Sequence, residues 1–236
     1  MQIIIFNDRL LIAYRAGTSE RAIISFSGIG AFRDGGGLPR EEFVQTLSGD
    51  DDHQYFVIDK IRSWYNSTSE EIVDVLDREL LNHSSCITLG NSMGGFGAVY
   101  FASQLPGCKA ALAFGPQFSV NPDIAPRERR WLDWRAAIDQ WKVPHAFTAA
   151  NTGMRFYLFF GDASDRYQAK LYRSNPMPKM AMIVVAGQKH NTASYLRDQA
   201  MLVPVIHAVW HGMDVEPLRM LLHKAGIETL DSNSQG

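Results

Sequence analysis

The sequence contains no long hydrophobic run, because no stretch of its 236 residues approaches the ~18 consecutive apolar residues of a membrane-spanning helix. Cysteine is nearly absent. Only Cys86 and Cys108 occur, and both lie in or beside apolar runs where a free thiol behaves as a small buried hydrophobe. The amino terminus has no basic segment, and its apolar run is much shorter than a secretory signal requires. These absences predict a soluble cytoplasmic protein without a disulfide framework.

A basic excess is absent too, since 23 lysines and arginines stand against 25 aspartates and glutamates, for a formal net charge of −2. Nucleic acids and anionic membrane surfaces attract clustered positive charge, so we expect neither as a partner. Residues 50–52 are three aspartates, but the spacing and closing glutamate of a calcium loop are missing, and we expect no metal site. The expected partner is a small molecule or a polymer end, and the sequence does not indicate an oligomeric state.

What the sequence does contain is a series of short apolar runs separated by turn residues. Eight runs rich in β-branched and aromatic residues predict strands: Gln2–Phe6, Leu10–Tyr14, Arg21–Phe26, Gln54–Asp59, Cys86–Leu89, Cys108–Gly115, Met154–Gly161 and Met180–Ala186. Helical spacing predicts helices over 69–82, 192–211 and 217–224. A chain of this length with both kinds of element predicts one α/β domain over residues 1–236. The polar tail 231–236 is expected to be disordered.

The stretch Gly90-Asn91-Ser92-Met93-Gly94 has the pattern G-x-S-x-G between a strand-like run and a run of small and apolar residues. This pattern places the serine on a sharp turn from strand to helix, with its hydroxyl clear of its own backbone. Glycine is needed two positions to either side, because the turn leaves no room for neighbouring Cβ atoms. The alternative is a glycine-rich turn that only lets a helix pack closely on a sheet. We interpret Ser92 as a nucleophile.

A serine hydroxyl needs a base to take its proton, and the base needs an acid to orient it. Downstream of Ser92, Asp162 and Asp165 follow one predicted strand and His190 follows the last, in the chain order Ser, Asp, His. His190 is the only one of the seven histidines that sits just past a strand end in a short glycine-containing loop. Of the two acids we prefer Asp165, because it lies deeper in its loop, and keep Asp162 as the alternative.

The predicted oxyanion hole combines two backbone N–H groups. One belongs to Met93, the residue after the nucleophile, and the other to the loop that follows the third predicted strand. In that loop Ile29 is our first choice and Gly28 the second. Loops at the carboxyl ends of strands are also where open α/β sheets bind ligands.

Residues 119–153 form an insert between the sixth and seventh strand-like runs and differ in composition from the rest of the chain. They include the tryptophans Trp131, Trp134 and Trp141 and the arginines Arg127, Arg129 and Arg130. A helical, aromatic and charged insert here suits a lid or pocket wall, with Trp131 and Trp134 lining the substrate; the alternative is that the tryptophans anchor packed helices. Trp64 and Tyr65, just past a central strand, either line the same pocket or cap the core.

Together these features resemble the α/β-hydrolase superfamily over nearly the whole chain. The resemblance rests on Gly90–Gly94 as nucleophile elbow, Ser27–Gly30 as oxyanion loop, Asp162–Asp165 as acid loop, His190 in the histidine loop, and the insert after the sixth strand. It implies a mostly parallel eight-stranded sheet flanked by helices, a serine acyl-enzyme mechanism and no cofactor.

The resemblance and the triad order favour a carboxylesterase-like serine hydrolase. Ser92 would attack a carbonyl, His190 would move the proton and Asp165 would orient His190, on a carboxylic ester, a thioester or an O-acetylated sugar. An acyltransferase that uses the same triad is the nearest alternative, with the insert's arginines binding an anionic acceptor. A different class of alternative is a binding or scaffolding protein that keeps the fold without turnover.

Overall fold

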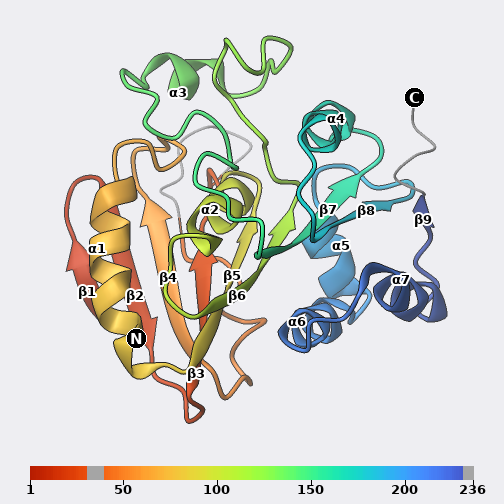
Figure 1. Ribbon diagram of the computed structural model, residues 1–236, viewed down its shortest axis with the longest axis horizontal. Coiled ribbons are helices and arrows are strands. Elements are labelled where there is room, and N and C mark those ends of the chain that lie inside the picture. The colour runs from red at the N-terminus through yellow and green to blue at the C-terminus, as the bar shows by residue number, and fades with distance from the viewer. Residues whose placement is uncertain (31–39, 231–236) are drawn as a thin grey trace.

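A single continuous sheet forms the centre of the molecule (Figure 1). The computed structural model describes residues 1–30 and 40–230, and within them the sheet has nine strands in the order β1-β2-β4-β3-β5-β6-β7-β8-β9. The strands are β1 (Gln2–Phe6), β2 (Leu10–Arg15), β3 (Arg21–Phe26), β4 (His53–Asp59), β5 (Ser85–Asn91), β6 (Cys108–Phe114), β7 (Arg155–Gly161), β8 (Met180–Val185) and β9 (Thr229–Leu230). The first eight match the runs expected to form strands, apart from small differences at their ends.

The central strands β4, β3, β5, β6, β7 and β8 pair in parallel, and antiparallel strands close both edges. The chain passes from β3 outward to β4 and then returns to place β5 on the other side of β3. The strand order therefore reverses between β3 and β5. Crevices for ligands form beyond the carboxyl ends of strands at such a switch point. This topology brings the loop after β3 beside the turn after β5.

The expected count of eight strands is wrong, because β9 adds a ninth. This strand is two residues long and pairs antiparallel with β8, with Val184 opposite Leu230 and Val185 opposite Thr229. Two residues carry no alternation of polar and apolar side chains, so periodicity gives no signal for such a strand. The tail expected to be disordered, 231–236, lies outside the described residues.

All the helices except α3 form two layers, one on each face of the sheet (Figure 1). They are α1 (Ser69–Glu79), α2 (Met93–Ala102), α3 (Leu132–Ala136), α4 (Arg166–Ser174), α5 (Thr192–Asp198), α6 (Leu202–Trp210) and α7 (Val215–Lys224). Apolar residues of α1, α2 and α4 join one core cluster, and those of α5, α6 and α7 join the other. The helix expected over 192–211 is broken into α5 and α6, where Ala200 adopts φ 56°.

Helix α2 is buried on every side. All ten of its residues are buried, which fits a segment of glycines and apolar residues with no polar face. Ser92, directly before it, is consequently fixed at the centre of the protein rather than on a surface loop.

The insert 119–153 lies between β6 and β7, as expected, but most of it is not helical. Its only helix in the structure as described is α3, five residues long, and the rest is turns and loops above the carboxyl end of the sheet (Figure 1). Val120, Val143 and Ala146 are buried in the same core cluster as α2. The expectation of a helical insert is therefore wrong for most of these residues; Pro122, Pro126 and Pro144 disfavour helix at both ends of the insert, and Trp131, with φ 56°, lies directly before α3.

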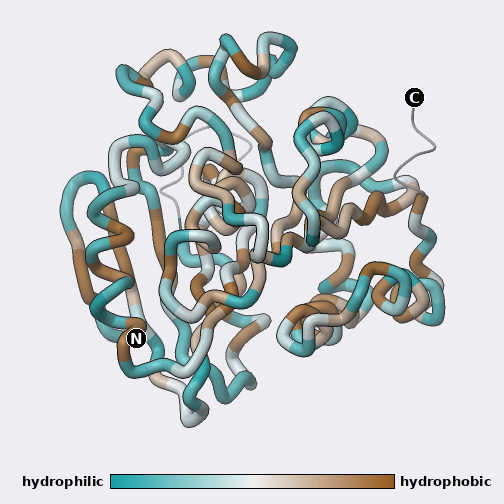
Figure 2. Tube along the Cα trace, in the orientation of Figure 1, coloured by the Kyte–Doolittle hydropathy of each residue, from teal (hydrophilic) through white to brown (hydrophobic). Residues whose placement is uncertain are grey.

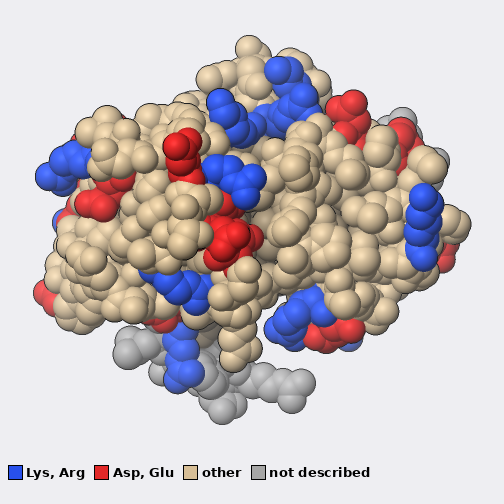
Figure 3. All heavy atoms as spheres, turned by 90° about the horizontal axis from the view of Figure 1, so that it is seen from below, with Lys and Arg blue, Asp and Glu red and all other residues tan. Residues whose placement is uncertain are grey.

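Hydropathy and charge follow this architecture. Hydrophobic residues concentrate along the strands, and hydrophilic ones along the outer loops (Figure 2). On the face shown in Figure 3, acidic and basic side chains are interspersed. Of the helices that could be assessed in residues 1–30 and 40–230, none has the length and apolar character needed to cross a bilayer.

Candidate active site

Ser92 occupies a sharp turn between the end of β5 and the start of α2, with φ 57° and ψ −120°. A residue with a side chain rarely adopts positive φ, so the surrounding structure must hold this conformation. The Ser92 N–H donates to the carbonyl of Phe114 at 2.8 Å, and the Phe96 N–H donates to the carbonyl of Ser92 at 3.0 Å. The serine side chain is thereby pinned at the carboxyl edge of the sheet, where it is 5% exposed.

The two glycines of the motif are required by close packing rather than by unusual dihedral angles. A Cβ on Gly90 would lie 2.0 Å from the carbonyl oxygen of Gly94, and one on Gly94 would lie 2.0 Å from the carbonyl oxygen of Phe26. Neither glycine has positive φ. The turn after β5 is therefore pressed directly against the end of β3.

His190 and Asp165 reach Ser92 from the ends of the last two parallel strands. The Nε2 atom of His190 lies 2.8 Å from Ser92 Oγ, and its Nδ1 atom lies 2.6 Å from Asp165 Oδ1. Asp165 is buried at the start of α4, and its other oxygen accepts the Gly161 N–H at 3.1 Å. An ionised carboxylate only accepts hydrogen bonds, so Nδ1 carries the ring proton and Nε2 is left to accept the serine hydroxyl.

The structure brings Asp165 to His190 but leaves Asp162 outside this chain of contacts. In the part of the protein that is described, Asp162 Oδ1 is buried without a hydrogen-bond partner. Gly115, which the sequence analysis did not single out, makes the close approach of His190 feasible. It has φ 50°, and a Cβ there would lie 2.8 Å from His190 Nδ1.

The three expected oxyanion donors belong to the start of α2 and to the loop after β3, two segments that pack against each other. Met93 begins α2, so its N–H has no partner within the helix. Ile29 is buried in the loop after β3. The N–H of Gly28 instead donates to Glu42 Oε1 at 3.0 Å, so it is already occupied. Of the three, the structure argues only against Gly28 as a donor to a substrate oxygen, and Met93 and Ile29 stay predictions.

Glu42, which sequence reasoning missed, is a largely buried carboxyl against the oxyanion loop. Burial raises the pKa of Glu42 from 4.5 to about 7, although the hydrogen bond from Gly28 acts in the opposite direction. Tyr65 holds the same loop from another side, because its hydroxyl donates to the carbonyl of Ser27 at 2.8 Å. The loop is thus fixed by two side chains before any ligand binds.

Trp64 and Tyr65 are both 0% exposed, so the structure places these two candidate pocket-lining residues in the core. Trp64 nevertheless contacts the site through Gln117, a second residue that sequence reasoning missed. The indole N–H of Trp64 donates to Gln117 Oε1 at 3.0 Å, and Gln117 Nε2 lies 3.2 Å from Ser92 Oγ. Gln117 is itself fully buried.

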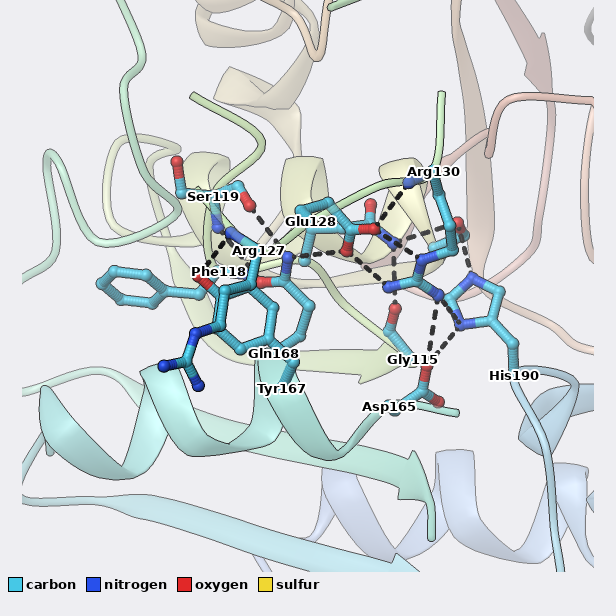
Figure 4. A network of polar contacts seen from close by, with 12 residues as sticks. Gly115, Phe118, Ser119, Arg127, Glu128, Arg130, Asp165, Tyr167, Gln168 and His190 are labelled. Atoms are coloured by element: carbon cyan, nitrogen blue, oxygen red, sulfur yellow. Dashed lines mark hydrogen bonds and ion pairs between the residues drawn. The ribbon is translucent and has the colours of Figure 1, made fainter. Parts of the chain in front are cut away.

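The insert contributes charged side chains near His190, and Figure 4 shows Arg130 between Glu128 and the His190–Asp165 pair. Arg130 pairs with Glu128 at 2.7 Å and lies 3.6 Å from Asp165 Oδ1. Its guanidinium stacks over the ring of Trp131 at 4.4 Å, and the Trp131 ring centroid is 5.9 Å from that of His190. Trp131 therefore lies beside His190, and its role in lining the substrate stays a prediction.

Two further interactions fix the insert to the body of the protein. Trp134 stacks with Arg62 at 5.2 Å, and Arg62 donates to the carbonyl of Ile29 at 2.8 Å. Burial opposes ionisation of Glu128, but hydrogen bonds from Arg130 and Gln168 outweigh it and hold the pKa of Glu128 at about 2.

Among the residues described, no group of three His, Cys, Asp or Glu side chains could hold a metal ion.

No protein-family model matches the sequence, and no curated protein matches it. Solved structures do match. The capsule O-acetyltransferase of Neisseria meningitidis serogroup A aligns with TM-score 0.60 and 14% identity over 86% of this chain and 93% of its own. An esterase of Pyrococcus furiosus aligns with TM-score 0.56 and 11% identity over 86% and 85%. An α/β hydrolase from a lagoon-sediment metagenome aligns with TM-score 0.56 and 11% identity over 90% and 100%.

The chain has the α/β-hydrolase fold. In this α/β-hydrolase fold, the sequence alone singles out three of the residues described above, Ser92, Asp165 and His190, because they follow predicted strands and because Ser92 lies in a motif. It does not single out Glu42, Gly115 or Gln117. The only sequence signal for Gln117 is its place two residues after Gly115, at the carboxyl end of a central strand. Glu42 has no such signal, because it follows no predicted strand and lies in no motif.

Proposed function

We propose that the chain is a serine hydrolase that cleaves a carboxylic ester through an acyl-enzyme on Ser92. The observation that carries the proposal is the continuous chain of contacts from Asp165 through His190 to Ser92, at 2.6 and 2.8 Å, on a strained turn at the sheet's switch point. A nucleophile held against an oriented base is the arrangement that acyl transfer to serine requires.

In the first half of the proposed reaction, Ser92 Oγ attacks the carbonyl carbon while its proton passes to His190 Nε2. The N–H groups of Met93 and Ile29 stabilise the oxyanion. The carbon–oxygen bond to the alcohol then breaks, and the alcohol leaves with the proton from His190. In the second half, water gives its proton to His190 and attacks the acyl-enzyme, after which Ser92 Oγ departs and takes that proton back. Apart from the ester and one water molecule, each step uses groups of the chain itself.

Acyl transfer to another alcohol is the second candidate, and two observations support it. Ser92 is only 5% exposed, and the insert covers the site, so water has restricted access. One structural neighbour is an O-acetyltransferase that acts on a capsule. The acceptor would then take the place of water, and an acylated saccharide would be the product. The remaining alternative is a binding or scaffolding protein.

Labelling of the intact protein with a fluorophosphonate, read by mass spectrometry, tests the shared mechanism. We expect one adduct on the wild type and none on Ser92→Ala or His190→Ala, with all three folded by circular dichroism. Failure of the folded wild type to label or to hydrolyse any p-nitrophenyl ester in a chain-length series would contradict the proposal and favour the binding alternative. Addition of a free saccharide during turnover separates the two enzymes, since a transferase yields acylated sugar in place of free acid.

A further inference from the structure

Gln117 has no counterpart in the triad, yet its side chain touches the nucleophile. It lies just past β6, is 0% exposed, and its Nε2 is 3.2 Å from Ser92 Oγ and 3.3 Å from the carbonyl oxygen of Gly115. The hydroxyl of Tyr172 donates to the backbone carbonyl of Gln117 at 3.1 Å, which fixes the main chain here. A buried amide with this many contacts has a single position.

The orientation of the amide follows from its partners. The indole N–H of Trp64 can only donate, so the group that faces it at 3.0 Å must be the amide oxygen. The carbonyl of Gly115 can only accept, so the group that faces it must be the amide nitrogen. A flipped amide would set two donors against each other at Trp64 and two acceptors at Gly115. The N–H of Gln117 therefore points at Ser92 Oγ.

Ser92 Oγ can receive this hydrogen bond. Its single proton is directed to His190 Nε2, because the other ring nitrogen donates to Asp165. The lone pairs of the oxygen remain, and one of them faces Gln117. Ser92 is 5% exposed, so the buried amide is a donor that the protein itself holds against the nucleophile.

We propose that Gln117 is a further catalytic residue, an amide donor that stabilises negative charge on Ser92 Oγ and is held in that orientation by Trp64. The inference rests on the proposed acyl-enzyme function. Charge grows on Oγ as His190 removes its proton, and again when Oγ leaves the acyl-enzyme. A hydrogen bond to a charged oxygen is stronger than one to a neutral hydroxyl, so the donor lowers both barriers. Gln117 transfers no proton in either step.

The expected effect is smaller than that of a full oxyanion-hole donor. Removal of such a donor lowers kcat by about 10²- to 10³-fold, and the contact to Ser92 Oγ is at the long end of hydrogen-bond distances. We expect Gln117→Met, which keeps the length of the side chain, to lower the rate of fluorophosphonate labelling by about 10- to 100-fold. Gln54→Met is the matched control, since Gln54 is also a buried amide but lies at the far end of β4.

The pH dependence of labelling in Gln117→Glu separates a catalytic role of Gln117 from a merely structural one. The introduced carboxyl can still accept from Trp64, but when ionised it presents an acceptor to Ser92 Oγ. Its buried position raises its pKa, so the neutral form, which can donate, is present at the acidic end of the range. The ratio of wild-type to Gln117→Glu labelling rates should rise with pH, whereas the ratio for Gln117→Met should stay constant. Gln117→Met introduces no charge, so its constant ratio is the reference against which the rise for Gln117→Glu is judged.

Trp64→Phe tests the orienting role and covers the case in which a Gln117 variant does not fold. Loss of the indole donor frees the amide to flip, so we expect slower labelling in the wild-type background and no further loss in Gln117→Met. A wild-type labelling rate in Gln117→Met, or an equal loss of labelling rate in Gln54→Met, would overturn the role of Gln117. Labelling of the wild type would still support the proposed serine hydrolase in that case. If the folded wild type does not label, the proposed function fails and this inference fails with it.

Discussion

The buried carboxyl of Glu42 makes the stability of the protein depend on pH in a direction opposite to that of most acids. Burial raises its pKa from 4.5 to about 7, while the hydrogen bond from Gly28 lowers it in part. The cavity of about 210 Å³ beside it is lined by Arg197 and Asn91 among others, and Tyr65 lies on the other side. We predict that Glu42→Gln removes this pH dependence, because an amide is isosteric with the carboxyl and does not titrate.

The sign and size follow from the two pKa values. Below pH 4.5 the carboxyl is neutral in both states, and its contribution to stability is fully present. Between pH 4.5 and about 7 the folded protein keeps the proton that the unfolded chain has lost, so stability falls as pH rises. At about 1.4 kcal/mol per pH unit, the interval corresponds to a loss of about 3 kcal/mol, complete near pH 7.

Urea denaturation followed by tryptophan fluorescence measures this loss. We expect the free energy of unfolding of the wild type, relative to Glu42→Gln, to decline by about 3 kcal/mol from pH 4.5 to pH 7 and then to level off. Glu216→Gln is the control, since that carboxylate is 71% exposed on α7 and its removal should matter little at any pH. Parallel curves for wild type and Glu42→Gln would refute the reasoning.

Two other changes separate residues that the sequence left undecided or did not single out. Asp165→Asn should lower kcat about 10⁴-fold, because an amide favours the wrong tautomer of His190, whereas Asp162→Asn should keep kcat within about 3-fold of wild type. Steady-state ester hydrolysis measures both values. Equal losses of kcat in the two variants would contradict the choice of Asp165. Gly115→Ala places a Cβ 2.8 Å from His190 Nδ1 at φ 50°, so it should slow labelling and lower stability by about 1–3 kcal/mol in the same urea assay. Wild-type labelling and stability in Gly115→Ala would show that the loop relaxes freely.

The sequence predicts those parts of the site that follow from strand ends. Parallel strands deliver their carboxyl ends to one edge, so Ser92, His190 and an aspartate after β7 had to converge once the strands were recognised. The choice between Asp162 and Asp165 depends on how the chain turns after Gly161, and the two differ by only three positions. Only coordinates show that the later one starts α4 and faces His190.

Residues that act from irregular segments carry no comparable signal. Gln117 is oriented by Trp64, 53 positions away in sequence, and Glu42 meets Gly28 across 14 positions. No periodicity or motif connects such pairs. The same reason explains the insert, which was expected to be helical but whose loops are held by side-chain contacts to α4 and to the segment after β4.

Those contacts bear on whether the first part of the insert opens as a lid. Glu128 is 4% exposed and is tied at once to Arg130 and, at 3.0 Å, to Gln168 of α4, the helix that Asp165 begins. Opening of this segment would break the hydrogen bond between Gln168 and Glu128 and would move Arg130 away from Asp165, whereas the Glu128–Arg130 pair would move as one unit. Helix α4 thus positions Asp165 at its start and also binds the insert through Gln168, so a displacement of Glu128 would disturb the helix that places Asp165. We therefore predict that residues 119–130 form a wall of the site rather than a lid.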